Sequence, residues 1–122
     1  MILFSTPRFV VRGWTLDDAE PAFELYGDPE VLRFLGTGDT PPDDSLDISR
    51  AKMEARVARW RTDERGLGMW AVELRAGGGV VGAVGLFPLL GKGPEIEVAY
   101  HIARARWGEG IAKAIAYFEI AR

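Results

Sequence analysis

A short glycine-containing segment near the end of the sequence has the composition of an anion-binding turn. Residues 106–112 read RWGEGIA, with Gly108 and Gly110 between a β-rich run and an apolar periodic segment. Glycines at a helix start let a phosphate approach the backbone, whose free N–H groups and dipole attract negative charge. Arg106 could add a charge-assisted contact. The residues alone are compatible with a phosphate cradle and with a simple turn between a strand and a helix.

Two acidic residues and a histidine alternate along the strand predicted at residues 95–102. Glu95, Glu97 and His101 fall on one face of that strand. They could transfer protons near neutral pH if burial raised the pKa of a carboxylate. A solvated sheet face shows the same alternation. His101 is the one histidine of the chain, and with no second histidine for a metal a structural or surface role suits it better than a catalytic one.

The stretch at residues 77–82 reads GGGVVG and matches the spacing GxGxxG of dinucleotide-binding proteins. That fingerprint requires a strand before the glycines and a helix after them. A second β-rich run follows the glycines here. We therefore predict a hairpin turn at this position and no nucleotide site.

Basic residues are frequent in the helix predicted at residues 45–63. Arg50, Arg56, Arg59 and Arg61 mostly lie away from its apolar face. Acidic residues interleave with them, so the pattern favours a solvated helix face over a surface for an acidic partner.

Hydrophobic periodicity predicts a strand, three helices, three strands and a final helix. The predicted ranges are strand 8–14, helices 18–27, 28–36 and 45–63, strands 67–76, 80–89 and 95–102, and a helix after Gly110 that carries Ile111, Ile115 and Phe118. Residues 36–44 have the composition of a mobile loop. Because hairpin connections dominate, we predict an α+β fold with a mostly antiparallel sheet flanked by helices, in one domain over residues 1–122.

The first two helices have recognisable starts. Thr15 and Asp18 both suit the N-cap of the first helix, and Pro21 favours Asp18 because a proline costs little in the first turn. Asp28 followed by Pro29 repeats the start signal for the second helix. A glycine follows each of these helices as the stop signal.

Composition limits the classes of function. The 122 residues suit one domain, and 48% hydrophobic with 27% charged residues is ordinary for a soluble protein. No apolar run approaches the roughly 18 residues of a membrane span, and the start shows no secretory leader, so we expect a cytoplasmic protein. A net charge of −3 gives no general attraction to nucleic acid. With no cysteine and one histidine, we expect neither a disulfide nor a metal site.

Two stretches together resemble a known family. Residues 6–36, TPRFVVRGWTLDDAEPAFELYGDPEVLRFLG, and residues 95–115, EIEVAYHIARARWGEGIAKAI, resemble the GNAT superfamily of N-acetyltransferases. The likeness is to the RimJ/RimL-like branch, which acetylates the N-termini of ribosomal proteins. It implies the acyl-CoA N-acyltransferase fold and acetyl-CoA as the co-substrate.

The resemblance also implies roles for individual residues. The segment WGEGIA is similar to the family's WGxGYA segment, whose backbone N–H groups hold the pyrophosphate of acetyl-CoA. The residues implied in that loop are Gly108, Glu109, Gly110, Ile111 and Ala112. Ile102 and Ala103 match the end of the family's fourth strand, where backbone groups bind the pantetheine arm.

Glu97 falls where members of this branch often carry a glutamate proposed as the general base. An amine is mostly protonated at neutral pH, so it must lose a proton before it attacks a thioester. A backbone N–H of the same strand would stabilise the oxyanion that develops.

The sequence departs from the family pattern at several positions. Ala105 stands where glutamine or arginine is common, and Ile111 replaces an aromatic residue. Because most contacts of such a loop are made by the backbone, neither change excludes binding. Family members continue with a fifth strand and further elements, so we expect a chain that lacks the C-terminal third of the domain. A tyrosine that often protonates the thiolate would lie there, and Tyr117 does not match it.

Two functions remain in view. The first is an N-acetyltransferase that moves an acetyl group from acetyl-CoA to a primary amine, which could belong to a protein N-terminus, an antibiotic or a small metabolite. The second is a non-catalytic module that self-associates through its exposed sheet edge, for example as a homodimer, because an unpaired edge strand invites pairing.

Overall fold

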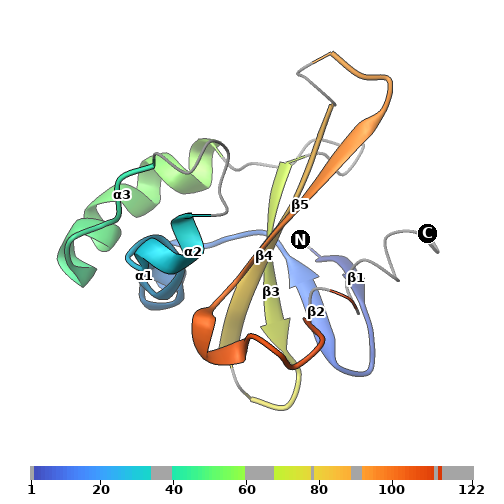
Figure 1. Ribbon diagram of the computed structural model, residues 1–122, viewed down its shortest axis with the longest axis horizontal. Helices are drawn as coiled ribbons and strands as arrows, with labels where there is room; N and C mark the ends of the chain where they lie inside the picture. The colour runs from blue at the N-terminus through green and yellow to red at the C-terminus, as the bar shows by residue number, and fades with distance from the viewer. Residues whose placement is uncertain are drawn as a thin grey trace.

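The computed structural model describes residues 2–33, 40–59, 68–77, 79–88, 92–111 and 113. One antiparallel sheet has the strand order β1-β2-β3-β4-β5, and the three described helices lie on one side of it (Figure 1). The strands are β1 (Ile2–Ser5), β2 (Phe9–Arg12), β3 (Gly68–Leu74), β4 (Gly79–Pro88) and β5 (Ile96–Ile102), and the helices are α1 (Ala19–Tyr26), α2 (Pro29–Leu32) and α3 (Leu46–Arg59). The predicted α+β class and antiparallel sheet are confirmed.

Strand β1 is the element that the sequence analysis does not predict. It pairs with β2, with Ile2 opposite Arg12 and Ser5 opposite Val10. Ile2 is exposed. A strand of four residues at a sheet edge is too short to show an alternation of apolar and polar positions, so its sequence carries no periodic signal.

The predicted helix starts are confirmed. Asp18 is the N-cap of α1, and Thr15 caps a short 3₁₀ turn that leads into it, so both candidate caps are used. Asp28 caps α2 and accepts a hydrogen bond from the Glu30 N–H at 3.0 Å, with Pro29 as the first helical residue. These starts are set by residues adjacent in sequence, which explains why local patterns find them.

The hairpin predicted at residues 77–82 is also confirmed, since β3 and β4 pair across the turn. Their register shifts where Val72 faces Gly82 but Glu73 faces Val80, which is a β-bulge in β4. Several predictions lie outside the described residues: the stop at Gly36, the positions Trp60 and Arg61, Ala112, and the final helix with Ile115, Tyr117 and Phe118.

Each face of the sheet has its own apolar cluster. On the helix side, Met69 and Ala71 of β3 pack with α1 and α2. On the opposite side, Trp70 and Val72 pack with Phe9 and with residues from the end of the described chain. The buried residues of this second cluster are Phe9, Val11, Trp70, Val72, Val81, Val84, Ile102 and Ile111. Ile111, which follows β5, therefore packs on the face opposite the described helices.

None of the described helices has the length and apolar character needed to cross a membrane.

Candidate functional site

The segment after β5 forms a glycine-dependent loop. A 3₁₀ turn (Arg104–Arg106) leads to Gly108 and Gly110, whose φ angles are 85° and 74°. Side chains other than glycine rarely adopt this left-handed conformation. A Cβ placed on either glycine would meet no atom within 4 Å, so the space above this backbone is open.

A cavity of about 420 Å³ lies over this loop, and we call it the loop cavity. Its volume is in the range of small-molecule sites. Arg106 and Lys113 give it two positive charges. Its lining residues are Ile102, Arg106, Trp107, Gly108, Gly110, Ile111 and Lys113. Five of these residues belong to the segment at 106–112, whose sequence is compatible with a phosphate cradle, and Ile102 lies at the end of β5.

Long-range contacts hold the loop in place. The Trp107 Nε1–H donates to the Ile102 carbonyl at 2.7 Å, which ties the loop back to the end of β5. Arg8 Nη2 donates to the Glu109 carbonyl at 3.2 Å and ties it to the residue before β2. The Arg106 guanidinium lies 3.5 Å from the Glu109 carboxylate. Hydrogen bonds thus hold the loop to the end of β5 and to the residue before β2.

At the end of β5, the backbone groups of Ile102 and Ala103 point in opposite directions. The Ala103 N–H donates to the Val81 carbonyl at 2.8 Å, and its carbonyl accepts from the Arg106 N–H at 2.8 Å. Both polar groups of Ala103 are therefore used within the chain. Since the direction of backbone groups alternates along an antiparallel strand, the N–H and carbonyl of Ile102 point away from β4.

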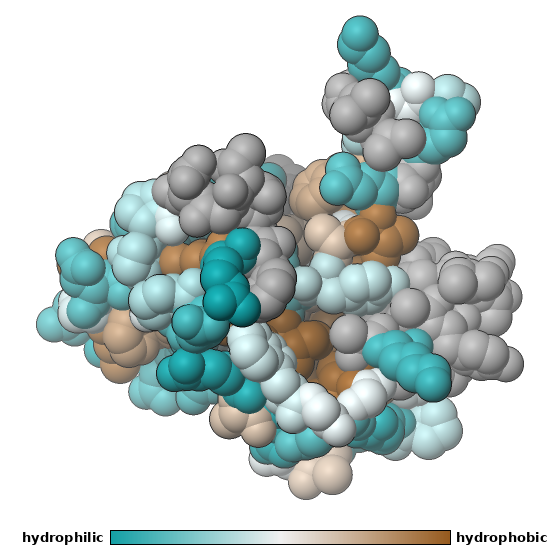
Figure 2. Space-filling view, viewed as in Figure 1, coloured by the Kyte–Doolittle hydropathy of each residue, from teal (hydrophilic) through white to brown (hydrophobic). Residues whose placement is uncertain are grey.

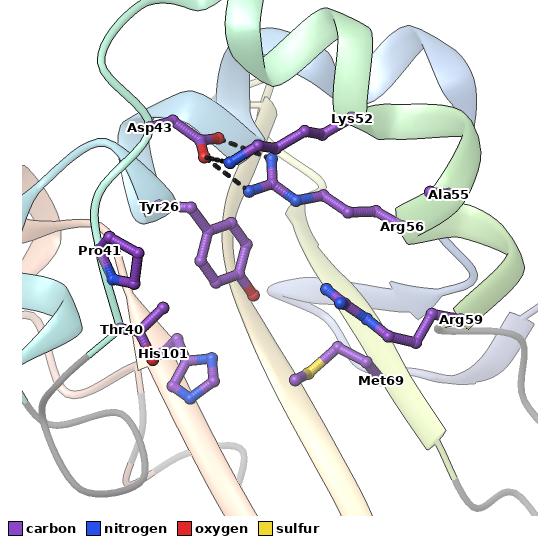
Figure 3. Close-up of a pocket in the computed structure, with 10 residues that line it drawn as sticks. All are labelled: Tyr26, Thr40, Pro41, Asp43, Lys52, Ala55, Arg56, Arg59, Met69 and His101. Carbon is purple, nitrogen blue, oxygen red and sulfur yellow. Dashed lines mark hydrogen bonds and ion pairs between the residues drawn. The ribbon is translucent and has the colours of Figure 1, made fainter.

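A second cavity, of about 380 Å³, lies between the helices and the sheet, and we call it the helix-side cavity (Figure 3). It is lined by α1, α3, β3, β5 and the segment before α3. The lining residues are Tyr26, Thr40, Pro41, Asp43, Lys52, Ala55, Arg56, Arg59, Met69 and His101. His101 and Ile102 are adjacent in β5 and so point to opposite faces. The two cavities therefore lie on either side of the end of one strand.

His101 forms part of the wall of the helix-side cavity. It is 6% exposed, and burial lowers the pKa of its imidazole, so the ring is neutral at neutral pH. Its ring lies edge-on to the Tyr26 ring, with the centroids 6.2 Å apart. Within the part of the chain that the structure describes, its Nδ1 atom has no hydrogen-bond partner. His101 is therefore a buried residue and not a surface residue.

An aspartate organises the opposite wall of this cavity. The Asp43 carboxylate accepts hydrogen bonds from Arg56 at 2.7 and 2.9 Å, from Lys52 at 3.1 Å and from the Ser49 hydroxyl. Burial raises the pKa of Asp43, but the hydrogen bonds from Arg56, Ser49 and Lys52 outweigh it and lower the pKa to about 2. The Asp43 N–H also donates to the Tyr26 carbonyl at 2.7 Å. These contacts fix the segment to α1 and α3.

One sequence-based expectation is wrong here, and another is only partly tested. Residues 40–44, the described part of the loop predicted at 36–44, form no helix or strand, and Asp43 within them is 3% exposed and bonded to Arg56. Arg56, assigned to a solvated face, is 8% exposed and lies over the Tyr26 ring at 5.1 Å. Arg56 follows the buried Met53 by three residues, a spacing that places both on one face of a helix. That spacing was the signal available in the sequence.

Glu97 lies apart from His101. It is exposed and faces Phe87 across the β4–β5 pair. This end of the hairpin extends beyond the rest of the molecule (Figures 1 and 2). Glu97 and His101 are four positions apart along the strand, which is about 13 Å. The structure therefore does not bring Glu95 and Glu97 together with His101 as one cluster.

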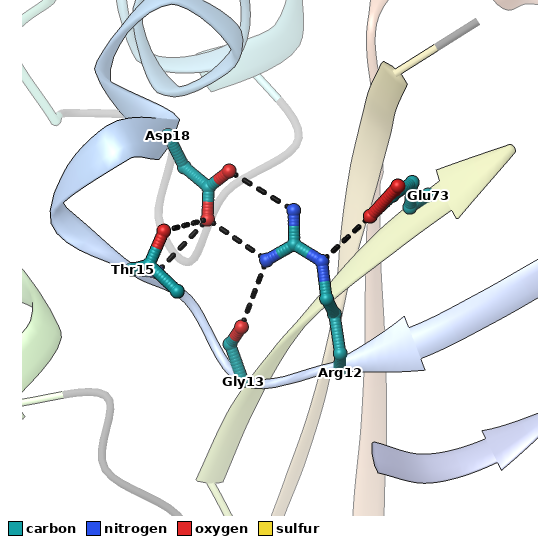
Figure 4. A network of polar contacts seen from close by, with 5 residues as sticks. All are labelled: Arg12, Gly13, Thr15, Asp18 and Glu73. Carbon is teal, nitrogen blue, oxygen red and sulfur yellow. Dashed lines mark hydrogen bonds and ion pairs between the residues drawn. The ribbon is translucent and has the colours of Figure 1, made fainter. Parts of the chain in front are cut away.

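A further charge network fixes the start of the helical layer (Figure 4). Arg12 at the end of β2 makes two hydrogen bonds to Asp18, at 2.9 and 3.0 Å, and one to Glu73 of β3 at 2.7 Å. The Thr15 N–H donates to the same Asp18 carboxylate at 2.8 Å. Burial raises the pKa of Asp18, but the hydrogen bonds from Arg12 and Thr15 and the positive charge of Arg12 together outweigh it and lower the pKa, so the carboxylate stays ionised. The sequence pattern indicates Asp18 as a cap, but it indicates neither the hydrogen bonds from Arg12 to Asp18 nor the contact of Arg12 with the distant Glu73.

Comparison with known proteins identifies the family. Residues 8–117 match the family model of the acetyltransferase (GNAT) domain. The chain is 26% identical over 113 residues to an uncharacterized N-acetyltransferase, YoaA of Bacillus subtilis (strain 168), covering 93% of this chain and 61% of that protein. It is 24% identical over 107 residues to an uncharacterized N-acetyltransferase, p20 of Bacillus licheniformis, covering 88% of this chain and 57% of that one.

A solved structure shows the same fold. The crystal structure of a GNAT-family acetyltransferase from Bacillus anthracis superposes with a TM-score of 0.67 and 16% identity, over 95% of this chain and 61% of that one. The chain thus spans about 60% of the length of the relatives that it matches. The chain belongs to the GNAT acetyltransferase family, and its antiparallel sheet with flanking helices is the GNAT fold.

Proposed function

We propose that the protein is an acetyl-CoA-dependent N-acetyltransferase that transfers an acetyl group to a primary amine. The main support for this proposal is the loop cavity. It joins two left-handed glycines, open space over their backbone and the cations Arg106 and Lys113. These features suit a pyrophosphate, which needs backbone N–H donors and positive charge.

We assign the pyrophosphate to the backbone of residues 108–112, of which Ala112 lies outside the described residues. Of the two strand residues implied by the family resemblance, Ile102 directs its N–H away from β4, where no further strand lies among the described residues, whereas both backbone groups of Ala103 are used within the chain. We therefore assign the pantetheine contact to Ile102. The Ile102 carbonyl already accepts a hydrogen bond from Trp107, so its N–H is the group available to bind the arm.

For the chemical step, we propose Glu97 as the general base. Its carboxylate takes a proton from the ammonium form of the acceptor, and the neutral nitrogen then attacks the thioester carbonyl carbon. The C–N bond forms, the C–S bond breaks, the nitrogen loses its second proton, and coenzyme A leaves as a thiolate that takes up that proton. A backbone N–H on the outer edge of β5 stabilises the oxyanion. The exposed position of Glu97 leaves its carboxylate accessible to an acceptor.

Isothermal titration with acetyl-CoA tests coenzyme binding. We expect binding by the unmodified chain and its loss in Gly110→Trp, because the side chain would fill the open space above the loop. Gly77→Trp is the matched control, since Gly77 has a φ of 92° and open surroundings in the β3–β4 turn. Equal binding by both variants, or no binding by the folded unmodified chain, would overturn the assignment.

Rate measurements test Glu97. Glu97→Gln should lower the rate of acetyl transfer by roughly 10² to 10⁴ while leaving coenzyme binding intact. Glu95→Gln is the control, because Glu95 is an exposed glutamate two residues earlier. An unchanged pH–rate profile in Glu97→Gln would remove this residue from the mechanism.

We further propose that the chain belongs to the RimJ/RimL-like branch and acts in the cytoplasm, on the strength of the two stretches that resemble that branch. A second candidate function is self-association through β5, which has no further strand beside it among the described residues. Phe87 and Val98 of the projecting hairpin are 37% and 38% exposed, which favours this candidate. Light scattering measures the oligomeric state, and the calorimetric titration measures acetyl-CoA binding. A folded dimer that binds no acetyl-CoA would support self-association alone.

A further inference from the structure

Trp107 has the largest side chain in the lining of the loop cavity, and it connects the two parts of that lining. Its indole Nε1–H donates to the Ile102 carbonyl at 2.7 Å, which holds the residue to the end of β5. The next residue along the chain is Gly108, the first glycine of the loop. Trp107 therefore joins the end of the strand to the glycine loop.

The rest of this side chain is accessible to solvent. Trp107 is 42% exposed, whereas Trp14 and Trp70, the other tryptophans in the described part of the chain, are buried. With its N–H bonded to Ile102, the indole presents only apolar atoms, and the hydrogen bond holds it in place. Covering such a surface with apolar groups of a ligand is favourable. The cavity therefore combines a backbone loop that suits an anion with an exposed apolar wall.

Acetyl-CoA carries the corresponding groups in the same order along its chain. Its pyrophosphate is followed by the pantoyl unit, whose quaternary carbon bears two methyl groups, and then by the first amide of the pantetheine arm. We assign the pyrophosphate to the backbone from Gly108 onward and the arm to the N–H of Ile102. The methyl groups are the part of the ligand between those two contacts, and Trp107 is the residue between them.

We propose that Trp107 is a specificity-determining residue of the coenzyme site, whose ring binds the two methyl groups of the pantoyl unit. This inference rests on the proposed acetyltransferase function. The hydrogen bond to the Ile102 carbonyl keeps the ring beside the residue whose N–H receives the arm. Ligands that contain a pantoyl unit gain this contact, whereas nucleotides that share only the pyrophosphate do not.

Calorimetric titration with two ligands tests the proposal. Acetyl-CoA carries the arm, and 3′-phospho-ADP is the nucleotide half of the same coenzyme without it. We expect Trp107→Ala to weaken acetyl-CoA binding by about tenfold, because two methyl groups lose their apolar contact, and to weaken nucleotide binding by less than about threefold. Equal weakening for the two ligands would show that Trp107 only holds the loop, and unchanged binding of both would show no role in the site. Either result would overturn the proposal.

Two further variants separate the ring surface from other effects of the substitution. Trp107→Phe keeps an apolar ring, so we expect it to recover most of the acetyl-CoA affinity lost in Trp107→Ala. Leu16→Ala is the control, because Leu16 is an apolar residue with 60% exposure that lines neither of the two cavities, and it should bind acetyl-CoA as the unmodified chain does. An affinity in Trp107→Phe as low as that of Trp107→Ala would refute binding by the ring.

Tryptophan fluorescence gives a second measurement of the same contact. Acrylamide quenches exposed indoles, so Trp107 should be quenched while the buried Trp14 and Trp70 are protected. We expect saturating acetyl-CoA to reduce the quenching in the unmodified chain and to leave that of Trp107→Phe unchanged. The nucleotide half should protect less than the whole coenzyme. Equal protection by the two ligands would contradict a contact with the pantoyl unit.

The same titrations distinguish this inference from the proposed function. If the folded, unmodified chain binds no acetyl-CoA, the coenzyme site is refuted and the acetyltransferase with it. If acetyl-CoA binds normally but Trp107→Ala affects both ligands equally or neither of them, only the role of Trp107 is refuted.

Discussion

Replacement of Asp43 by asparagine tests how the wall of the helix-side cavity is held together. The carboxylate is the shared acceptor for Arg56, Lys52 and Ser49, and it links the segment before α3 to that helix. In Asp43→Asn the buried Arg56 guanidinium loses its ion pair with Asp43. Removal of one member of a buried ion pair costs about 3 to 5 kcal/mol of unfolding free energy. A typical domain has about 5 to 15 kcal/mol in total.

The pKa of Asp43 gives a second measure of the same interaction. A folded-state pKa of about 2, against an ordinary value of 3.8, corresponds to about 2 kcal/mol of stabilisation at neutral pH. Because the folded pKa is lowered, this stabilisation is present above pH 4 and is lost as the pH falls toward 2. The difference in unfolding free energy between the unmodified chain and Asp43→Asn should therefore shrink by about 2 kcal/mol between pH 5 and pH 2.

A double-mutant cycle isolates the pair. Urea unfolding followed by circular dichroism gives the cost of Asp43→Asn, Arg56→Met and the double variant at pH 7. We expect each single change to cost about 3 to 5 kcal/mol and the double change to cost at least about 2 kcal/mol less than their sum. Asp47→Asn is the control, because this carboxylate is 93% exposed and its ion pair contributes less than about 1 kcal/mol. Additive costs, or a difference that does not change with pH, would refute the reasoning.

Two further changes test the end of β5. Gly82→Ala places a Cβ atom 2.5 Å from the His101 carbonyl oxygen and 2.8 Å from Ile102 Cδ1, so β4 and β5 must separate, and we expect urea unfolding to show a loss of about 1 to 3 kcal/mol; unchanged stability would contradict this packing. His101 is held neutral by burial, which lowers its pKa, so the unfolded chain binds the extra proton and stability falls as the pH drops below about 6.5. His101→Leu should remove this loss between pH 7.5 and pH 5, and an identical pH dependence in the variant would show that His101 does not cause it.

Local signals explain what the sequence predicted correctly. The caps at Asp18 and Asp28 act within one helical turn, and the β3–β4 hairpin follows from alternation on both sides of a glycine turn. The loop with Gly108 and Gly110 is found in the same way, because its conformation depends on the glycines themselves. Strand β1 was missed because four edge residues carry no period.

Contacts between distant segments explain what was missed. Arg56 bonds to Asp43, thirteen residues earlier, and Arg12 bonds to Glu73, sixty-one residues later. A charged residue within a mixed helix face looks solvated unless its partner is known. The helix-side cavity depends on four separate elements and a connecting segment, so the periodicity of any one of them could not indicate it.

The register of β5 links the sheet to both cavities. A shift of this strand by one residue would exchange the faces of His101 and Ile102, and each cavity would lose the residue that it takes from β5. Gly82 lies opposite Ile102, and its missing side chain permits the close approach of the His101 carbonyl. The bulge that brings Gly82 to this position also turns Val80 and Ala83 toward the helices. An irregularity in β4 thus sets where β5 places His101 and Ile102, and with them one wall residue of each cavity.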